Sequence, residues 1–349
     1  MTATRVAILG ASGSIGRQAL DVVAAHPDRL RVTRSGRRGD DLVALATADD
    51  VDVVLVATPG IAGLGPTIAA LRAGKRVALA NKEVLVVGGH LVRALSGGAG
   101  DRLRPVDSEH CALWQCLSGV DPDDVARVTL TASGGPFREA PLSEMSSVTP
   151  ERALRHPTWK MGPKVTVDSA TLVNKAYEVI ETHWLYGLPY DRIDVVVHPE
   201  SVVHALVELV DGSVIAQLAE PDMRLPIQYA LLWDRAPSPA PRLDLSRARQ
   251  LTFRGAPAPE RYPCFETVLR AARGGDPRAV VGASAADEIA VERFLDGDVP
   301  FDGIVGLLRE GIEAALRTPP RPEPSLVDIE AIDSAVRGAL AAAPTAARS

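Results

Sequence analysis

Short apolar runs alternate with amphipathic stretches through the first hundred residues. We expect the runs to be buried strands and the stretches between them to be helices, because their apolar positions recur at strand and helix spacing. The expected strands are Val6–Leu9, Leu30–Thr33, a run that starts at Val51, and Arg76–Ala80, and the helices start near Ile15 and Gly65. This alternation predicts a Rossmann-like parallel sheet within an α/β protein.

The second half of the chain has a different pattern. Residues 193–223 are expected to form three strands, with Asp211–Gly212 as the turn of a hairpin. The proline-rich stretch 235–241 predicts a linker, and from Tyr262 onward the pattern is that of a helical bundle. We expect four parts in order, an abridged nucleotide-binding domain (1–106), a central catalytic and dimerisation domain with an antiparallel-containing sheet (107–233), a linker (234–258) and a C-terminal helical bundle (259–349).

Residues 165–184 predict one helix from Ala170 onward, because their apolar positions recur every three or four residues. The polar residues near its start are Asp168, Ser169, Asn174, Lys175 and Glu178. One of the first two is expected to cap the helix, and the others to lie together on it. Hydroxyl, amide and ammonium groups at a helix start favour an anion such as phosphate. An ordinary amphipathic helix with a solvated polar face is the alternative.

A glycine-rich turn follows the first expected strand. Its glycines are Gly10, Gly13 and Gly16. Strand, glycine turn and helix in this order are typical of a dinucleotide site, where the pyrophosphate lies on the start of the helix. The second strand leads into Gly36, Arg37 and Arg38, where two arginines would suit the 2′-phosphate of NADP. A solvated basic loop is the alternative at that place.

Acidic residues point to a divalent cation. Asp107 and Glu109 flank Ser108 before an expected helix from about Cys111, and with Glu178 they would supply hard oxygen ligands for Mg²⁺ or Mn²⁺. A cluster that only caps the helix is the alternative. Asn81, Lys82 and Glu83 follow an expected parallel strand, the end of which faces the ligand crevice in such sheets.

Two loops carry further candidates. Ser133-Gly134-Gly135 could form an anion nest at the end of a strand. Residues 156–164 are rich in proline and glycine yet carry Trp159 and Met161, which predicts either a lid over bound ligand or simple packing on the surface.

Composition narrows the class of protein and its cellular setting. The net charge of −6 argues against a nucleic-acid protein, and no apolar run approaches the length of a membrane span. Three cysteines without metal-ligand spacing favour a reduced, cytoplasmic setting. Only five residues are lysine, and two of them, Lys82 and Lys175, fall in the motifs above.

Nine short motifs taken together resemble the 1-deoxy-D-xylulose 5-phosphate reductoisomerase family. In chain order they are GASGSIG, ALANKE, PVDSEH, SGGPF, HPTWKMG, VDSATLVNK, HPESVVH, DGSVIAQL and EPDM. The resemblance covers nearly the whole chain. It implies an NADPH- and divalent-metal-dependent enzyme, a homodimer, that converts 1-deoxy-D-xylulose 5-phosphate to 2-C-methyl-D-erythritol 4-phosphate in isoprenoid biosynthesis.

The resemblance also implies roles for individual residues. Asp107, Glu109 and Glu178 would be the metal ligands, and they count with Lys82 and His156 as the catalytic set. The substrate and its phosphate would be bound by Ser108, Ser133, Trp159, Ser169, Asn174 and Lys175. NADPH would be bound by Gly10, Ser12, Gly13, Ser14, Ile15, Gly36, Arg37, Arg38, Asn81, Glu83, Met161, Gly162 and Met223.

Two departures from the family pattern bear on these expectations. The chain lacks about one strand–helix–strand segment between the second strand and Val51, so NADPH affinity and NADP preference are open. The family's N-A-A-N-E is here Ser284-Ala285-Ala286-Asp287-Glu288. Two alternatives to the family activity therefore stay open, a paralogue that acts on another phosphorylated or phosphonate ketose, and a non-catalytic relative.

Overall fold

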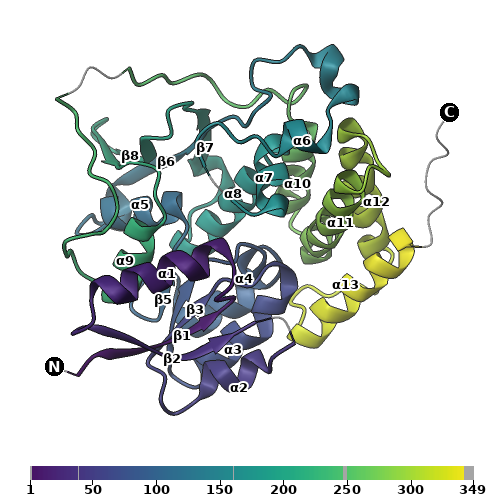
Figure 1. Cartoon of the computed structure of the whole chain (residues 1–349). Coiled ribbons are helices and arrows are strands. Elements are labelled where there is room, and N and C mark those ends of the chain that lie inside the picture. Colours follow the sequence, from purple (N-terminus) through teal and green to yellow (C-terminus); the bar gives the residue numbers. More distant parts are fainter. Residues whose placement is uncertain (1, 38, 160, 247–249, 342–349) are drawn as a thin grey trace.

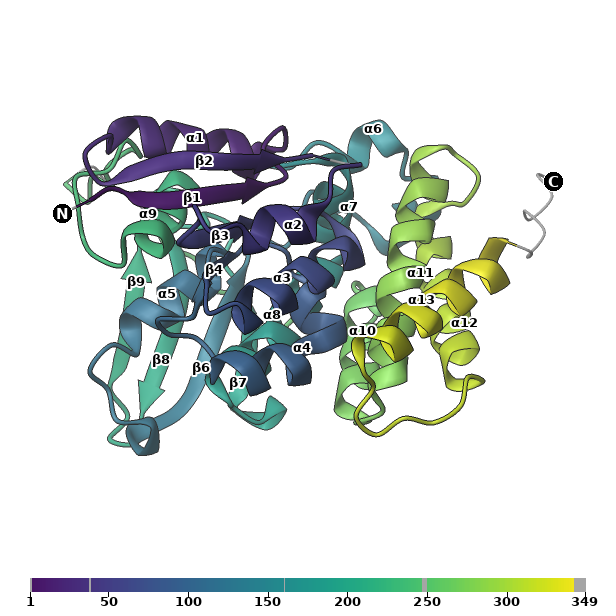
Figure 2. The ribbon, with the colours of Figure 1, turned by 90° about the horizontal axis from the view of Figure 1, so that it is seen from below.

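The computed structural model describes residues 2–37, 39–159, 161–246 and 250–341 (Figure 1). A parallel sheet with its helices forms one part, a second sheet with further helices forms the next, and four helices form the last. Viewed from below, the four helices lie beside the other two parts, and the two sheets lie on the same side of them (Figure 2). No helix in the described part of the chain is both long and apolar enough to cross a membrane.

The N-terminal sheet confirms the predicted Rossmann-like architecture. Its five parallel strands, in spatial order, are β2 (Leu30–Gly36), β1 (Thr4–Leu9), β3 (Val53–Val56), β4 (Arg76–Leu79) and β5 (Leu103–Pro105). Its helices are α1 (Ser14–Ala25), α2 (Leu42–Thr47), α3 (Leu64–Arg72) and α4 (Glu83–Ser96). Val6 and Ile8 of β1 pack in one apolar cluster with α1, and Ala7 and Leu9 pack in another with α3 and α4. Helices therefore cover both faces, and the sheet is doubly wound.

Strand β2 is the edge of this sheet, where the chain is shorter than the family pattern. It runs on to Gly36, three residues beyond the predicted end, because Gly36 still pairs with Leu9. Only α2 lies between β2 and β3. Arg31 and Arg34 are exposed along the edge, and Arg34 bonds Asp50 at 3.0 Å. Charged side chains of this kind discourage pairing with a second chain at an open edge.

The second sheet mixes strand directions. In spatial order it contains β7 (Ile193–Val197), β6 (Val125–Ala132), β8 (Val203–Leu209) and β9 (Val214–Leu218), with only β6 and β7 parallel. The three predicted strands of residues 193–223 are thus confirmed. The hairpin is confirmed as well, since Gly212 has φ +85° and Leu209 donates to the carbonyl of Ser213 at 2.8 Å.

The helix predicted from Ala170 is two helices. Helix α7 (Pro163–Thr171) ends at Leu172, which has φ +59°, and α8 (Val173–Tyr186) starts directly after it. The prediction that Asp168 or Ser169 caps a helix is wrong, because both lie inside α7. The earlier start follows from Pro163 at the first helical position, where its missing N–H removes no hydrogen bond.

Three further helices occur between β5 and the linker along the chain. They are α5 (Ser108–Cys116), α6 (Pro150–Ala153) and α9 (Arg224–Leu232). Helix α5 starts three residues before the predicted Cys111, and α2, α4, α6 and α9 were not predicted. Short 3₁₀ turns occur at Gly60–Gly63, Pro122–Asp124, Leu142–Ser147, Tyr190–Arg192 and Phe301–Gly303.

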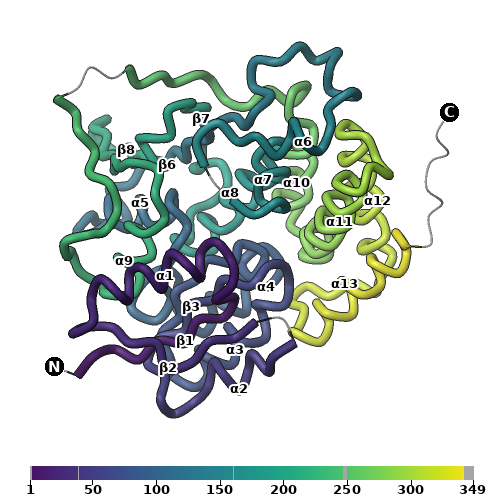
Figure 3. The backbone as a smooth tube through the Cα atoms, in the orientation of Figure 1, coloured from purple at the N-terminus to yellow at the C-terminus, as the bar shows by residue number. Residues whose placement is uncertain are grey.

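The predicted linker and helical bundle are present. In the described part of 234–258 the chain has no helix or strand, apart from an isolated bridge between Arg254 and Val197. The bundle contains α10 (Pro263–Arg273), α11 (Pro277–Leu295), α12 (Ile304–Leu316) and α13 (Leu326–Ala341). The tube view shows α13 starting beside the N-terminal part, where Pro324 accepts from His90 of α4, and running from there along the bundle toward the C-terminus (Figure 3). The division into domains at 106, 233 and 258 stays a prediction.

Glycines set the spacing of α11 and α12, which gives the first testable prediction. A Cβ at Gly282 would lie 2.6 Å from the carbonyl oxygen of Gly311 and 2.6 Å from Cβ of Ala315. Gly282→Ala should therefore destabilise the protein by about 1–3 kcal/mol through overpacking, measured by urea unfolding. Gly338→Ala is the matched control on α13, because a Cβ at that position would meet no neighbour within 4 Å. The control should be neutral or more stable by about 0.5–1 kcal/mol; equal effects at both sites would contradict the close approach.

Candidate active site

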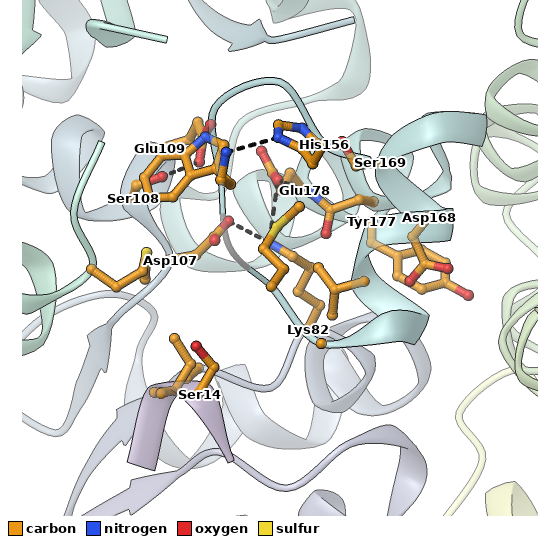
Figure 4. A pocket seen from close by; sticks show the side chains of 18 of the residues that line it. Ser14, Lys82, Asp107, Ser108, Glu109, His156, Asp168, Ser169, Tyr177 and Glu178 are labelled. Carbon is orange, nitrogen blue, oxygen red and sulfur yellow. Dashed lines mark hydrogen bonds and ion pairs between the residues drawn. The ribbon is translucent and has the colours of Figure 1, made fainter. Parts of the chain in front are cut away.

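A cavity of about 840 Å³ lies where the N-terminal sheet, the second sheet and helices α7 and α8 meet. Its walls carry most of the predicted site residues, although these are far apart in the sequence. In Figure 4, Ser14 at the start of α1 lies on one side of the cavity, and Glu109 and His156 lie on the other. Lys82 and Asp107 lie between them.

Nineteen of the predicted site residues line this cavity. They are Gly13, Ser14, Ile15, Asn81, Lys82, Glu83, Asp107, Ser108, Glu109, Ser133, His156, Trp159, Met161, Gly162, Ser169, Asn174, Lys175, Glu178 and Met223. Gly10, Ser12, Gly36 and Arg37 lie outside it, and Arg38 lies outside the described residues. The lining set contains the predicted substrate and nicotinamide residues and, of the predicted pyrophosphate turn, Gly13, Ser14 and Ile15. The four described residues outside it belong to the predicted adenosine and pyrophosphate end.

The three predicted metal ligands converge. Asp107 precedes α5, Glu109 lies in the first turn of α5, and Glu178 lies on α8, yet a carboxylate oxygen from each lies within 4.8 Å of the others. All the donors are hard oxygens, which suits Mg²⁺ or Mn²⁺. Asn174 adds to the fit, because its amide donates to Glu178 at 2.6 Å and its own buried Oδ1 has no partner.

Two lysines lie among these carboxylates. The ammonium of Lys82 contacts Asp107 at 2.5 Å and Glu178 at 3.2 Å, and that of Lys175 contacts Glu109 at 3.1 Å and also pairs with Glu178. Burial and the charge of Glu109 raise the pKa of Glu178 above its ordinary value. Two lysine ammonium groups therefore lie among the three predicted metal ligands.

A second group behind the first was missed from the sequence. His110 Nδ1 lies 3.2 Å from Asp107 and 3.8 Å from Glu181, and both His110 and Glu181 are buried. Although burial opposes it, the charges of Glu181 and Asp107 raise the pKa of His110 to about 9. Burial raises the pKa of Glu181 to about 7. The sequence signal was the helix spacing, since His110 lies three residues after Asp107 and Glu181 three after Glu178.

The loop of the predicted anion nest is a turn with two glycines at positive φ. Gly134 and Gly135 have φ +79° and +65°, and a Cβ at Gly135 would lie 2.7 Å from the carbonyl oxygen of Ser169. The glycines therefore let the loop that carries Ser133 lie against α7. This close approach brings two hydroxyls of the predicted phosphate site to one side of the cavity.

His156 is held as a neutral ring next to Ser133. Its Nδ1 accepts from the backbone N–H groups of Trp159 at 2.8 Å and Thr158 at 3.2 Å. Its proton is therefore on Nε2, which lies 3.1 Å from Ser133 Oγ and donates to it. Burial and the charge of Arg138 lower the pKa of His156 to about 4. The Ser133 hydroxyl keeps its own proton to donate into the cavity.

The glycine turn after β1 has the form expected of a dinucleotide site. Gly10 has φ +95°, and a Cβ there would lie 2.5 Å from the carbonyl oxygen of Ala57. A Cβ at Gly16 would lie 2.4 Å from the carbonyl oxygen of Gly10. Side chains would thus fill the space between the turn and the start of α1, so the residues present fit a pyrophosphate there.

Asn81 and Glu83 are already engaged within the protein. The Asn81 amide donates to the carbonyl of Gly60 at 2.8 Å, and its oxygen accepts from the N–H of Val84 at 2.9 Å. Glu83 contacts Lys164 at 3.0 Å. Their predicted cofactor contacts stay predictions, and the structure adds a role for both in fixing the start of α4. Lys164 and the buried His204, which also line the cavity, were not among the predicted site residues.

Comparison with known proteins identifies the family. Models of the 1-deoxy-D-xylulose 5-phosphate reductoisomerase match residues 6–37 and 33–89, and models of its C-terminal domains match residues 103–186 and 218–339. The reductoisomerase of Thermomicrobium roseum is 46% identical, with 96% of this chain and 95% of the relative covered. The chain belongs to the 1-deoxy-D-xylulose 5-phosphate reductoisomerase family.

Solved structures of the family agree with this assignment. A reductoisomerase in complex with NADPH, fosmidomycin and magnesium is 34% identical, with a TM-score of 0.89, and covers 97% of this chain and 98% of its own. The Zymomonas mobilis enzyme in complex with NADPH is 38% identical, with a TM-score of 0.86 and the same coverage. The predicted family and fold are both confirmed.

The comparisons also locate the missing segment. The alignment with the Thermomicrobium roseum enzyme runs over 373 positions, more than the 349 residues of this chain. The family model matches the N-terminal part in two pieces that meet at residues 33–37, the end of β2. The shortening predicted from the sequence therefore falls at the open edge of the N-terminal sheet.

The state of His156 gives a second prediction. The unfolded chain takes up a proton on this residue near pH 6.5, whereas the folded protein does so only near pH 4. Between these values the folded state binds fewer protons, so His156 lowers stability as the pH falls from about 6.5 to about 4. His156→Gln should flatten this part of the stability profile, measured by urea unfolding at pH 5 and pH 7. A His156 ring that titrates near pH 6.5 by NMR in the ligand-free protein would contradict the assignment.

Proposed function

We propose that this chain catalyses the NADPH- and divalent-metal-dependent rearrangement and reduction of 1-deoxy-D-xylulose 5-phosphate to 2-C-methyl-D-erythritol 4-phosphate. The observation that carries the proposal is the convergence of Asp107, Glu109 and Glu178 on one cavity with the start of α1 at its other side. Relatives that cover the whole chain have this activity in their names, and two solved relatives hold NADPH.

Asp107, Glu109 and Glu178 would hold Mg²⁺ or Mn²⁺. The ion supplies Lewis acidity toward the ketone and a neighbouring hydroxyl of the substrate. The carboxylates orient it, and Asn174 holds Glu178 in place through its 2.6 Å hydrogen bond. Lys82, already 2.5 Å from Asp107, would contact the substrate's oxygens together with Ser108.

Lys175 links the two halves of the substrate site. Its ammonium now neutralises Glu109 and Glu178. With a divalent cation held by those carboxylates, Lys175 would be available to bind the substrate phosphate together with Ser133, Ser169 and Asn174. Binding energy from this phosphate, remote from the reacting carbons, would orient the substrate.

NADPH supplies the hydride that reduces the rearranged aldehyde. The turn at Gly10, Ser12, Gly13, Ser14 and Ile15 would hold its pyrophosphate at the start of α1. Met161, Gly162 and Met223 would face the nicotinamide, because all three line the cavity. Gly36 and Arg37 would face the adenosine ribose, where an arginine suits a 2′-phosphate; Arg38, predicted with them, lies outside the described residues.

We also propose a homodimer formed through the second sheet. Strand β9 is its open edge, and Val214 and Ile215 on β9 are 54% and 37% exposed. Val210, in the preceding turn, is 65% exposed. An apolar edge strand of this kind is a template for association, so a second copy of the chain is its expected cover.

The cysteines support a cytoplasmic location for the enzyme. Cys111, Cys116 and Cys264 are all buried and free, and burial raises the pKa of Cys111 to about 12. Free thiols are typical of reducing compartments.

We also propose that the chain divides at residues 106, 233 and 258 into a nucleotide-binding domain, a catalytic domain, a linker and a helical domain.

Turnover tests the proposed function directly. Purified protein with 1-deoxy-D-xylulose 5-phosphate and Mg²⁺ should oxidise NADPH, followed by its absorbance. Glu178→Gln should weaken Mn²⁺ binding by more than about tenfold, since even residues behind metal ligands contribute that much, and should abolish most turnover. Manganese affinity is measured by titration, independently of activity.

Glu292→Gln is the matched control, because Glu292 is exposed on α11. It should leave metal affinity and turnover as in the unchanged protein. Unaltered Mn²⁺ affinity in Glu178→Gln would remove this residue from the metal site. Binding of NADPH and Mn²⁺ without turnover would instead point to another phosphorylated or phosphonate ketose as the substrate.

The dimer has its own test. Ile215→Lys should convert the dimer to a monomer in analytical ultracentrifugation, because a buried ammonium would lie in the interface. Val327→Lys on α13, where the side chain is 73% exposed, is the matched control and should leave the mass unchanged. A dimer of unchanged stability in Ile215→Lys would exclude β9 as the interface.

A further inference from the structure

One partly buried ammonium joins three parts of the fold. The Nζ atom of Lys164 lies 2.7 Å from Asp287, 2.8 Å from Asp168 and 3.0 Å from Glu83. The Tyr177 hydroxyl donates to the same oxygen of Asp287 at 3.3 Å, and Lys164 lies 5.1 Å from the centre of its ring. Figure 4 shows Asp168 and Tyr177 together at one end of the cavity. We call these five residues the Lys164 cluster.

The carboxylates come from different parts of the fold. Glu83 starts α4 beside the N-terminal sheet, Asp168 lies on α7, and Asp287 lies on α11 of the helical bundle. Lys164 is the second residue of α7 and therefore follows directly on the loop whose described residues are 154–159 and 161–162. That loop forms one wall of the cavity through His156, Trp159 and Met161 among others. The cluster thus fixes the end of a ligand-facing loop to two other parts of the protein.

We propose that Lys164 and Asp287 are positioning residues for the reductoisomerase reaction, and that the Lys164 cluster holds the described residues of the preceding loop, 154–159 and 161–162, in the conformation that binds substrate and NADPH. The proposal rests on the proposed function for the identity of these ligands. Neither residue is required to touch a reacting atom. Their effect is to raise the fraction of molecules in which the loop is ready to bind.

The charges of the cluster explain why the contact is strong. Three carboxylates face one ammonium, and Glu83, Asp168 and Asp287 are 7%, 2% and 0% exposed. One oxygen each of Asp168 and Asp287 is buried without a partner. Burial and mutual repulsion with neighbouring carboxylates raise the pKa of both groups. The excess negative charge of the three carboxylates keeps the Lys164 ammonium among them and, although burial opposes it, raises the pKa of Lys164 well above its ordinary value.

Asp287 allows a clean test because it lies behind the cavity wall. Lys164, Asp168, Glu83 and Tyr177 line the cavity, whereas Asp287 is not among the described lining residues. An effect of Asp287 on ligand binding must therefore pass through the cluster. Asparagine, which the family pattern carries here, can accept the same two hydrogen bonds from Lys164 and Tyr177, whereas serine is too short to reach them.

The experiment compares Asp287→Ser with Asp287→Asn. In Asp287→Ser, the KM for substrate and for NADPH should each rise about tenfold while kcat changes less than about threefold, because fewer molecules are competent to bind. Trypsin should cut after the exposed Arg155 about ten times faster in the ligand-free protein, measured by mass spectrometry of the peptide that starts at His156. Asp287→Asn should stay within about threefold of the unchanged protein in every measurement.

Arg270→Met is the control for loss of an ordinary ion pair, because Arg270 on α10 has a side chain that is 78% exposed. It should change neither the KM values nor the cleavage rate. Unchanged KM values and cleavage in a folded Asp287→Ser would overturn the proposal, and so would an equal loss in Asp287→Asn. If circular dichroism shows that Asp287→Ser does not fold, the same KM and cleavage measurements are made on Lys164→Met, with the same expected changes. Trypsin cleavage and NADPH titration do not require turnover. They therefore test the effect of the Lys164 cluster on the loop even if the protein lacks reductoisomerase activity.

Discussion

The arrangement of this protein depends on lysine ammonium groups buried among carboxylates where its parts meet. Lys82 and Lys175 lie between Asp107, Glu109 and Glu178, and Lys164 lies between three further acids. Taking so many charges out of water is costly unless each is paired closely. Each lysine therefore requires the elements that carry its partners to stay together, and the junction is held by charge as well as by apolar packing.

The same pairing prepares the site for its ligands. In the proposed reaction a divalent ion would bind the three carboxylates, and Lys82 and Lys175, which line the same cavity, would face anionic substrate groups. Glycine turns at Gly10 and Gly135 bring the chain close enough for backbone and hydroxyl groups to line the opposite ends of the same cavity.

Local sequence patterns predicted much of the fold, because they depend on neighbours in the chain. The strand–glycine–helix unit at Gly10, the hairpin at Gly212 and the C-terminal helices follow from such patterns. The break at Leu172 does not, since a buried leucine with φ +59° is held there by tertiary packing and by the start of α7 at Pro163. Short helices such as α2 and α9 also escape, because one or two turns give little periodicity.

The candidate site was predictable in residue type, and the family resemblance supplied the grouping. Asp107 and Glu109 could be singled out as a pair, but their meeting with Glu178 depends on how α5 packs beside α8. His110 and Glu181 were missed because helix spacing alone does not separate a buried polar residue from a solvated one. The Lys164 cluster was missed for another reason, since its members come from four helices and no short motif contains them.

The order of strands in the N-terminal sheet explains how a family member can lose a whole segment and keep its site. Strand β5 leads directly into Asp107, so that side of the sheet positions one of the candidate metal ligands. Strand β2 lies at the far side and carries its own charged border. A segment next to β2 can therefore be absent from this edge, while β1 and β5, which lead into the glycine turn and into Asp107, keep their places in the sheet.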